Sequence, residues 1–264
     1  MIDDPAATVQ RLITRYLISV VAFSIMLGHI SPYMLFEKIA SPTPHRTKYD
    51  DLANIINTIK ASSVNDPVTL YVYEHKIPGR WRRQLSRMLD SLVLSNFIER
   101  QTAWTCDAGD AYLFYSDPAK HKTRRQKLVL KFAVFMFGLI RTAEQKRRSE
   151  EVSKKMDAAV REALGDRKKD MFYLDHLGTT PAKQGRGYGT ALCKVLADEA
   201  DARGAASYLG SSNVETNTPF YNSVGFYTVK EFVVGDDPTW KKPPVVIAVM
   251  VREVPTTDYK VELV

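Results

Sequence analysis

The chain has 264 residues, of which 45% are hydrophobic and 25% charged, and its formal net charge is +7. Such a composition is ordinary for a globular protein and supports a sizeable core in one large or two small domains. The two cysteines, Cys106 and Cys193, stand in unrelated contexts without metal-ligand spacing. We therefore expect no disulfide scaffold, no metal site and a reducing, cytoplasmic environment.

The first 40 residues differ in character from the rest of the chain. Residues 16–36 carry no formal charge, and a run of about 20 apolar residues can span a bilayer. Only residues 16–28 are densely apolar, however, and no convincing small-residue cleavage site follows them. We expect residues 1–46 to form an apolar helix and a linker ahead of the folded domain. A membrane anchor through residues 16–36 is the alternative that we favour less.

Helix and strand patterns alternate from about Thr47 onward. Apolar residues at helical spacing predict one helix over residues 50–62 and another over residues 79–95. Strands are predicted over residues 98–106 and 111–116, joined by a hairpin turn at Asp107–Asp110. The second helix has arginines on one face and an apolar set on the other, consisting of Trp81, Leu85, Met88, Leu89 and Leu92.

Residues 120–170 form a basic segment, with 16 Lys and Arg against 7 Asp and Glu. A localised positive charge suits acidic lipids, nucleic acid or a phosphorylated cosubstrate. Because no nucleic-acid module signature accompanies the charge, we expect a solvated helical face and no nucleic-acid partner. We expect one long helix or two here, and we assign to core packing a set of apolar residues at helical spacing: Leu128, Phe132, Phe135, Met136 and Leu139.

The last third of the chain has the clearest pattern. A strand over residues 171–177 leads to the sequence QGRGYG at residues 184–189. A helix over residues 190–203 follows, and Gly204 ends it as a C-cap. The remaining predicted elements are a strand over 205–211, a short helix over 218–223, a strand over 226–234, and a continuous apolar strand over 245–251 that is typical of burial on both faces.

The QGRGYG sequence has three glycines immediately ahead of a helix. Glycine adopts φ > 0 and lets another molecule approach the backbone closely. The first N–H groups of a helix lack intrahelical partners and attract anions, phosphate above all. The residues from Gly185 to Thr190 therefore suit a phosphate cradle, with a tight turn between packed elements as the alternative. The spacing matches neither a nucleoside-triphosphate P-loop nor a dinucleotide-binding loop.

Two motifs in this region resemble the GNAT superfamily, the acetyl-CoA-dependent N-acetyltransferases. Gln184, Gly187 and Gly189 match the motif Gln/Arg-x-x-Gly-x-Gly/Ala, and Pro219–Phe226 resembles the family's second signature. The sequence Tyr-Leu-Asp-His-Leu-Gly before the loop is similar to a fungal-type subset of the family. The resemblance is close over roughly residues 171–253, rests on element order alone over 47–117, and does not cover residues 1–40.

The resemblance implies an α/β (α+β) fold with a mixed central sheet, splayed between its fourth and fifth strands and flanked by helices. The domain would cover residues 47–264. Residues 120–168 would form a long helical insertion between the third and fourth strands, and the N-terminal helix would be an extension.

The resemblance also implies acetyl-CoA as cosubstrate. The pantetheine arm would pair with the backbone of the fourth strand, and the pyrophosphate would lie on the N–H groups of the loop. Arg186 would add charge, although a solvated arginine is the alternative. The implied cofactor-binding residues are Leu177, Gly178, Thr179, Gln184, Gly185, Arg186, Gly187, Tyr188, Gly189, Thr190, Asn217 and Phe220.

Tyr221 matches a position where the family commonly has a tyrosine near the coenzyme sulfur, and a phenol can protonate a departing thiolate. For the general base, strand alternation places Tyr173, Asp175, Leu177 and Thr179 on one face. Asp175 is the carboxylate on that face, and partial burial would raise its pKa. An ordered water chain is the alternative base. His176 is expected to face the opposite way.

We therefore expect an acyltransferase that moves acetyl to a primary amine, most simply on a small molecule, by direct attack. The acceptor cannot be identified from the sequence. A catalytically silent acyl-CoA-binding module, perhaps tethered to a membrane, is the alternative function. A membrane-surface role driven by residues 11–36 and 120–148 could coexist with catalysis.

Overall fold

The computed structural model describes residues 41–74, 79–236 and 238–255. The chain divides after Ser41, and the compact unit that begins at Pro42 is the one described here. The predicted N-terminal helix and the membrane alternative at residues 16–36 lie outside the described residues. Within the described ranges, no helix has both the length and the apolar character needed to cross a bilayer.

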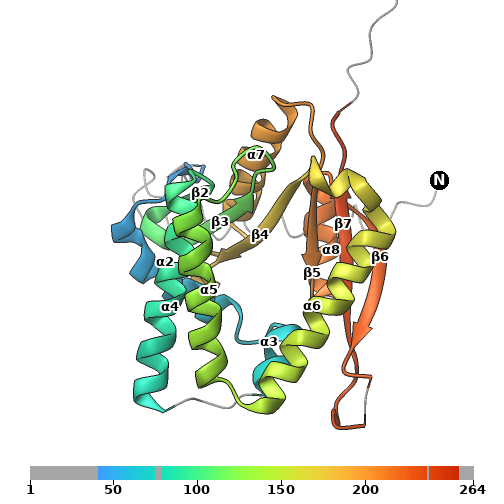
Figure 1. Ribbon diagram of the computed structural model, residues 1–264. Helices are drawn as coiled ribbons and strands as arrows, with labels where there is room; N and C mark the ends of the chain where they lie inside the picture. Colours follow the sequence, from blue (N-terminus) through green and yellow to red (C-terminus); the bar gives the residue numbers. More distant parts are fainter. Residues whose placement is uncertain (1–40, 75–78, 237, 256–264) are drawn as a thin grey trace, which may run out of the picture. The chain divides into compact units, whose positions relative to one another are not determined.

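A mixed sheet forms the centre of the unit (Figure 1). Its seven strands within the described residues have the order β1-β2-β3-β4-β5-β7-β6. Only β4 and β5 pair in parallel, and the other neighbours are antiparallel. The strands are β1 (His45–Arg46), β2 (Ala103–Cys106), β3 (Ala111–Ser116), β4 (Phe172–Thr179), β5 (Ser207–Ser211), β6 (Tyr227–Val234) and β7 (Val245–Arg252).

The parallel pair β4–β5 separates after three residue pairs. Phe172, Tyr173 and Leu174 pair with β5, and no later residue of β4 does so within the described part of the chain. Beyond this point β4 continues beside β3 to Thr179, while β5 continues beside β7 to Ser211. The expected mixed sheet, splayed between its fourth and fifth strands, is confirmed.

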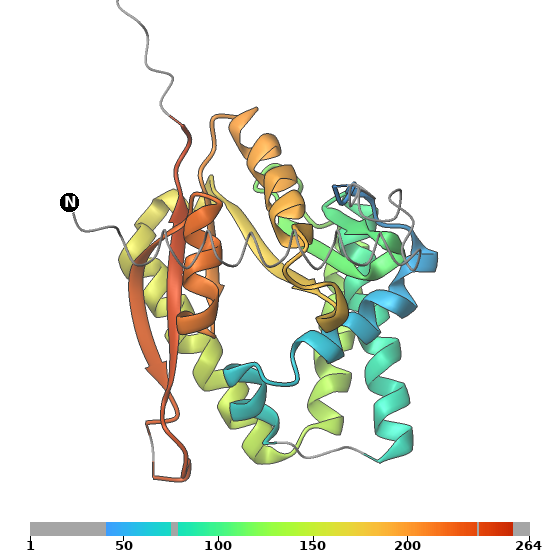
Figure 2. The ribbon, with the colours of Figure 1, turned by 180° about the vertical axis from the view of Figure 1, so that it is seen from behind.

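Helices cover both faces of the sheet. Figure 1 shows the face with α4, α5 and α6, and Figure 2 shows α7 and α8 on the opposite face. Short 3₁₀ turns occupy Tyr49–Asp51, Asp107–Gly109, Gly165–Lys169 and Pro181–Lys183. The α-helices are α2 (Leu52–Ser62), α3 (Pro67–Tyr73), α4 (Arg80–Glu99), α5 (Arg124–Ile140), α6 (Ala143–Leu164), α7 (Tyr188–Asp201) and α8 (Val214–Ser223).

The basic segment forms two helices because two capping boxes start them separately. The Thr123 side chain accepts from the Gln126 backbone N–H, and the Gln126 side chain reaches back to the Thr123 backbone. Thr142 and Gln145 repeat this arrangement at the start of α6. Each box satisfies N–H groups that a helix start leaves without partners. The choice between one helix and two is thereby decided in favour of two.

Two local predictions are wrong. The strand predicted from Ile98 begins at Ala103, because α4 continues to Glu99. The short helix α3 is not among the predicted elements. Its signals are nevertheless present: Asp66 accepts a hydrogen bond of 2.7 Å from the Thr69 N–H, and Pro67 stands at the first helical position.

The core assignment for α5 is also wrong for four of its five residues. Ala133 is fully buried on the side of α5 that meets the domain, and α4 packs against α5. Four of the residues assigned to the core lie on the other side, where Leu128, Phe132, Phe135 and Leu139 are 53–69% exposed, whereas Met136 is half-buried. Trp81 and Met88 of α4 are likewise 61% and 64% exposed. Periodicity alone could not identify the buried side, because α5 is apolar on two sides.

Truncating a buried leucine and an exposed leucine should have different effects on the free energy of unfolding. Leu196 of α7 is 1% exposed and Leu128 of α5 is 69% exposed. Leu196→Ala should lower the free energy of unfolding by about 2–5 kcal/mol, because it leaves a cavity. Leu128→Ala should change it by less than about 0.5 kcal/mol. Urea unfolding of both variants measures the difference, and equal losses would contradict the assignment of the two faces.

Candidate active site

The loop between β4 and α7 presents bare backbone. Gly185 and Gly187 have φ of +73° and +83°, and a Cβ built on either would meet no atom within 4 Å. Gly187 is the N-cap of α7 in the left-handed conformation, which favours glycine. No carbonyl among the described residues accepts a hydrogen bond from the backbone N–H groups of residues 185–190. These donors are therefore available at the positive end of the helix.

Gly189 is small for a different reason. A Cβ at this position inside α7 would lie 3.0 Å from Cζ of Phe220. The missing side chain lets the Phe220 ring of α8 rest against the first turn of α7. The structure thus brings Phe220 next to the loop.

The loop is anchored to the turn between β2 and β3. Lys183 Nζ lies 2.6 Å from Asp107 Oδ2 and 2.8 Å from Asp110 Oδ2. The Tyr188 hydroxyl also donates to Asp107, and the Thr180 N–H donates to the Asp110 carbonyl at 2.7 Å. Hydrogen bonds from Lys183 and Tyr188 hold the pKa of Asp107 below its ordinary value. The Tyr188 side chain is thus directed to the turn.

The predicted cofactor-binding stretch of β4 has one edge paired and one edge open. Leu177, Gly178 and Thr179 pair with β3, and their other edge faces the separation from β5. Gly178 leaves room for the Tyr112 ring, since a Cβ there would lie 2.4 Å from the Tyr112 hydroxyl. The backbone of this stretch therefore has hydrogen-bonding groups toward the splay.

A β-bulge changes which side chains of β4 share a face. His176 pairs with Phe114 and Leu174 pairs with Tyr115, so Asp175 has no opposing residue on β3. Leu174 and Leu177 consequently both pack into the core beneath α7. The predicted grouping of Asp175 with Leu177 on one face is therefore wrong, because simple alternation fails at the bulge.

Asp175 and His176 both point to the sheet face opposite α7. Ser116 follows Tyr115, which lies in the core beneath α7, so Ser116 points the other way and donates to Asp175 Oδ2 at 2.6 Å. The His176 ring stands edge-on to Phe114, which packs with α2 and α4. His176 was expected to face away from Asp175, and this expectation is wrong for the same reason.

Burial shifts the pKa values of both Asp175 and His176. It raises the pKa of Asp175 to about 6, an effect that the Ser116 hydrogen bond and the positive charges of Lys122 and Arg100 partly offset. It lowers the pKa of His176, although the imidazole keeps an exposed surface. Near neutral pH, Asp175 is mostly ionised and His176 mostly neutral, so each can accept a proton.

Tyr221 of α8 approaches the splay from the other face. Its side chain is 9% exposed and its ring lies 5.1 Å from that of Phe220. Burial raises its pKa, and Cys193, Tyr112 and Tyr173 add to the increase. No described residue forms a hydrogen bond with its hydroxyl. Tyr221 therefore stays protonated near neutral pH and is able to donate a proton.

Two further residues complete this description. Asn217 Nδ2 lies 3.5 Å from Ser211 Oγ at the end of β5, the strand that separates from β4. Tyr208 of β5 was not identified from the sequence. Its ring lies 4.8 Å from that of Tyr173, across the last paired positions of the two strands. Alternation along β5 would have indicated that Tyr208 faces Tyr173, but only with knowledge of how β4 and β5 pair.

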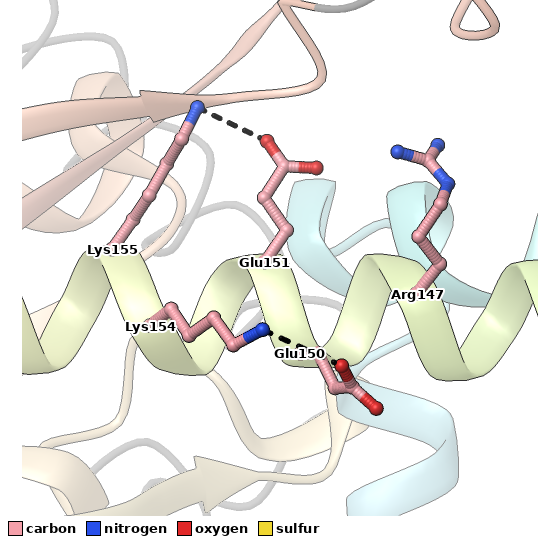
Figure 3. Close-up of a pocket in the computed structure, with 5 residues that line it drawn as sticks. All are labelled: Arg147, Glu150, Glu151, Lys154 and Lys155. Atoms are coloured by element: carbon pink, nitrogen blue, oxygen red, sulfur yellow. Dashed lines mark ion pairs between the residues drawn. The ribbon is translucent and has the colours of Figure 1, made fainter.

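A pocket on α6 lies apart from these residues. Figure 3 shows its lining by side chains of one helix, with Lys155 paired to Glu151 at 3.1 Å and Lys154 paired to Glu150 at 3.6 Å. Arg147 completes the lining. These are ordinary ion pairs one helical turn apart, and none of the predicted site residues lines this pocket.

Comparison with known proteins agrees with this geometry. Residues 140–227 match the model of the acetyltransferase (GNAT) family, and they include β4, the loop, α7, β5 and α8. The structure resembles arylalkylamine N-acetyltransferase 2 from Aedes aegypti, with a TM-score of 0.54, 13% identity, and coverage of 80% of this chain and 98% of that one. It also resembles an agmatine N-acetyltransferase variant, with a TM-score of 0.50, 11% identity, and coverage of 81% and 100%. Residues 140–227 therefore match the GNAT acetyltransferase family model, and the fold of the described residues is that of these acetyltransferases.

The raised pKa of Asp175 predicts a pH-dependent stability difference. The folded pKa of about 6 lies above the ordinary 3.8, so the contribution is present at low pH and is lost as pH rises through 6. Asp175→Asn should therefore be more stable than the wild type above pH 7, by up to about 3 kcal/mol, with the gap closing toward pH 4. Unfolding measured across this range tests the sign.

Asp50→Asn is the matched control, because Asp50 is an exposed aspartate in the turn before α2. It should shift stability by less than about 0.5 kcal/mol at each pH. A pH-independent difference for Asp175→Asn would show that burial does not raise this pKa.

Proposed function

We propose that the protein is an N-acetyltransferase that transfers the acetyl group of acetyl-CoA to the primary amine of a small molecule. The observation that carries the proposal is the separation of β4 from β5 directly before a glycine loop with free N–H groups, inside the segment that the family model matches. In this arrangement an open strand edge, an anion-binding helix start and a proton donor border one opening.

The residues present fit acetyl-CoA. The loop donors of residues 185–190 have no carbonyl acceptor among the described residues, and the space over Gly185 and Gly187 is open. These groups would hold the pyrophosphate, with exposed Arg186 adding charge. The open edge of β4 at residues 177–179 would hold the pantetheine amides. Gln184 donates to the Thr179 carbonyl at 3.2 Å and so braces the junction between strand and loop.

The remaining chemistry is proton transfer. Bound acetyl-CoA would supply a thioester whose carbonyl carbon the acceptor amine attacks. Asp175 takes the proton that the attacking ammonium must lose, directly or through a water, and neutral His176 on the same face is a second acceptor. Tyr221 gives its proton to the departing thiolate from the other side of the splay. The β4 amides polarise the carbonyl.

Direct attack by the amine is supported by the state of the cysteines. Burial raises the pKa of Cys193 to about 12 and that of Cys106 to about 11. Neither thiol is ionised near neutral pH, and only a thiolate is a good nucleophile. An acyl-cysteine intermediate is therefore not needed and not favoured.

Calorimetric titration of the full chain tests the proposed cosubstrate. Acetyl-CoA should bind with micromolar affinity, and ADP and NAD should bind more weakly. Gly187→Ala should weaken acetyl-CoA binding by about tenfold, because its methyl group enters the space over the loop donors. The absence of acetyl-CoA binding by folded wild-type protein would refute the proposal.

Gly204→Ala is the matched control for the loop. Gly204 lies just beyond the other end of α7, also has φ > 0, and also has open space around a built Cβ. Both substitutions should cost about 1 kcal/mol of stability, but only the one at Gly187 should affect the ligand. Equal effects on binding would indicate a general loss of helix order.

Replacement of Tyr221 tests the proton donor. Tyr221→Phe should lower kcat by about 10²-fold or more while leaving the acetyl-CoA Kd unchanged. Release of free thiol from acetyl-CoA measures turnover against a panel of primary amines, with an arylalkylamine and agmatine among the probes. Tyr227→Phe, an exposed tyrosine of β6, is the control and should retain full activity.

An unchanged kcat in Tyr221→Phe would remove this residue from the mechanism. Tight acetyl-CoA binding without turnover of any amine in the panel would favour a catalytically silent acyl-CoA-binding module.

A further inference from the structure

The pair α4–α5 exposes a set of large apolar side chains. Leu128, Phe132, Phe135 and Leu139 are 69%, 53%, 63% and 60% exposed, and they recur at helical spacing along one side of α5. Trp81 and Met88 of α4 are 61% and 64% exposed. We call these six residues the apolar face. Soluble proteins rarely leave such large side chains grouped in water without a partner.

The α4 part of the apolar face lies on the side of α4 that is turned toward α5. Trp81 and Met88 are seven residues apart, and Leu92 follows one turn later on the same side. Leu92 lines a groove together with Val129 and Arg125 of α5. The exposed residues of the two helices therefore flank one common junction.

Basic residues predominate beside the apolar face, although α4 also carries Asp90 and Glu99, and Glu99 lines the groove between the two helices. α5 has no aspartate or glutamate, and its first two turns carry Arg124, Arg125, Lys127 and Lys131, all exposed. The first two turns of α4 carry Arg80, Arg82, Arg83 and Arg87, also exposed. None of these eight residues forms an ion pair with a carboxylate in the described part of the chain, so their charge is available to an external partner.

We propose that the apolar face docks on the surface of an anionic lipid bilayer. Phenylalanine and leucine on one side of a helix with lysine and arginine beside them are the features of helices that lie in the lipid interface. Anionic headgroups supply the counter-charge that the eight basic residues lack. Docking through this face would add membrane association to the proposed acetyl transfer, without requiring that transfer.

The other occupants offer less counter-charge, since residues 1–40 carry three acidic residues (Asp3, Asp4 and Glu37) against three basic ones (Arg11, Arg15 and Lys38). A second copy would bring the same basic helices to the interface. The apolar residues 16–28 of this chain are preceded by Arg11 and Arg15, which would add positive charge. The same uncharged segment, residues 16–36, instead agrees with a lipid partner, because stable membrane association takes two weak signals rather than one.

Trp81 provides a local probe of docking in the full chain. It is one of three tryptophans, and Trp240 is buried while Trp104 is half-buried. Vesicles of phosphatidylcholine with about a third phosphatidylserine should shift Trp81 emission to the blue, and brominated lipid should quench it. Phosphatidylcholine alone and high salt should weaken both effects. Trp81→Phe should remove the signal while the protein still sediments with the vesicles.

Paired variants test the two components of the face. Phe132→Ser with Phe135→Ser should weaken vesicle binding at least tenfold, and Lys127→Glu with Lys131→Glu by about thirtyfold. Val64→Ser with Val246→Ser is the apolar control, and Lys154→Glu with Lys194→Glu is the charge control; both alter exposed residues elsewhere and should bind normally. An unchanged urea unfolding transition shows that each variant is folded.

Three results would overturn the proposal. The folded protein could fail to bind anionic vesicles. It could bind them with no change at Trp81, which would assign binding to another part of the chain. Sedimentation could show self-association that the Phe132 and Phe135 substitutions abolish, which would make the apolar face a contact between copies.

Discussion

The separation of β4 from β5 after three residue pairs is the constraint on which the candidate site depends. A strand inside a sheet normally uses both edges for pairing, and an unpaired edge is stable only where it is covered or solvated. Here β3 holds one edge of β4, and the other edge turns to the opening. The parallel pairing at Phe172–Leu174 keeps the two halves of the sheet joined, and the bulge at Asp175 lies immediately beyond it. The end of the β4–β5 pairing, the bulge and the opening therefore all occur at the same point along β4.

The bulge also explains why acid–base groups gather at this point. It inserts one residue, so that Asp175 and His176, which are adjacent in sequence, turn to the same face. Burial then raises the pKa of Asp175 toward neutral pH and lowers that of His176, which keeps the imidazole neutral. On the opposite face, burial keeps Tyr221 protonated. The groups proposed as proton acceptors and proton donor thus lie on the two sides of the opening.

The sequence predicted the elements that depend on local chemistry. The strands from β3 onward and helices α2, α7 and α8 lie within a few residues of their predicted bounds. Their bounds depend on hydrophobic periodicity and on glycines at the ends of elements, and both can be read from the local sequence. The bulge could not be predicted, since it is defined by the residue that β3 places opposite β4. The buried side of α5 could not be predicted either. Val129 and Ala133 are apolar like Leu128 and Phe132, and only the packing of α4 decides between the two sides.

The contact between Gly189 and Phe220 packs the first turn of α7 directly against α8. Gly189 belongs to the first turn of α7, beside the loop, and Phe220 immediately precedes Tyr221 on α8. A ring that rests on bare backbone cannot move without shifting its neighbour in sequence. A displacement of the first turn of α7 would therefore press on Phe220, the residue next to Tyr221. A methyl group added at Gly189 would do the same, because its carbon would lie 3.0 Å from the Phe220 ring.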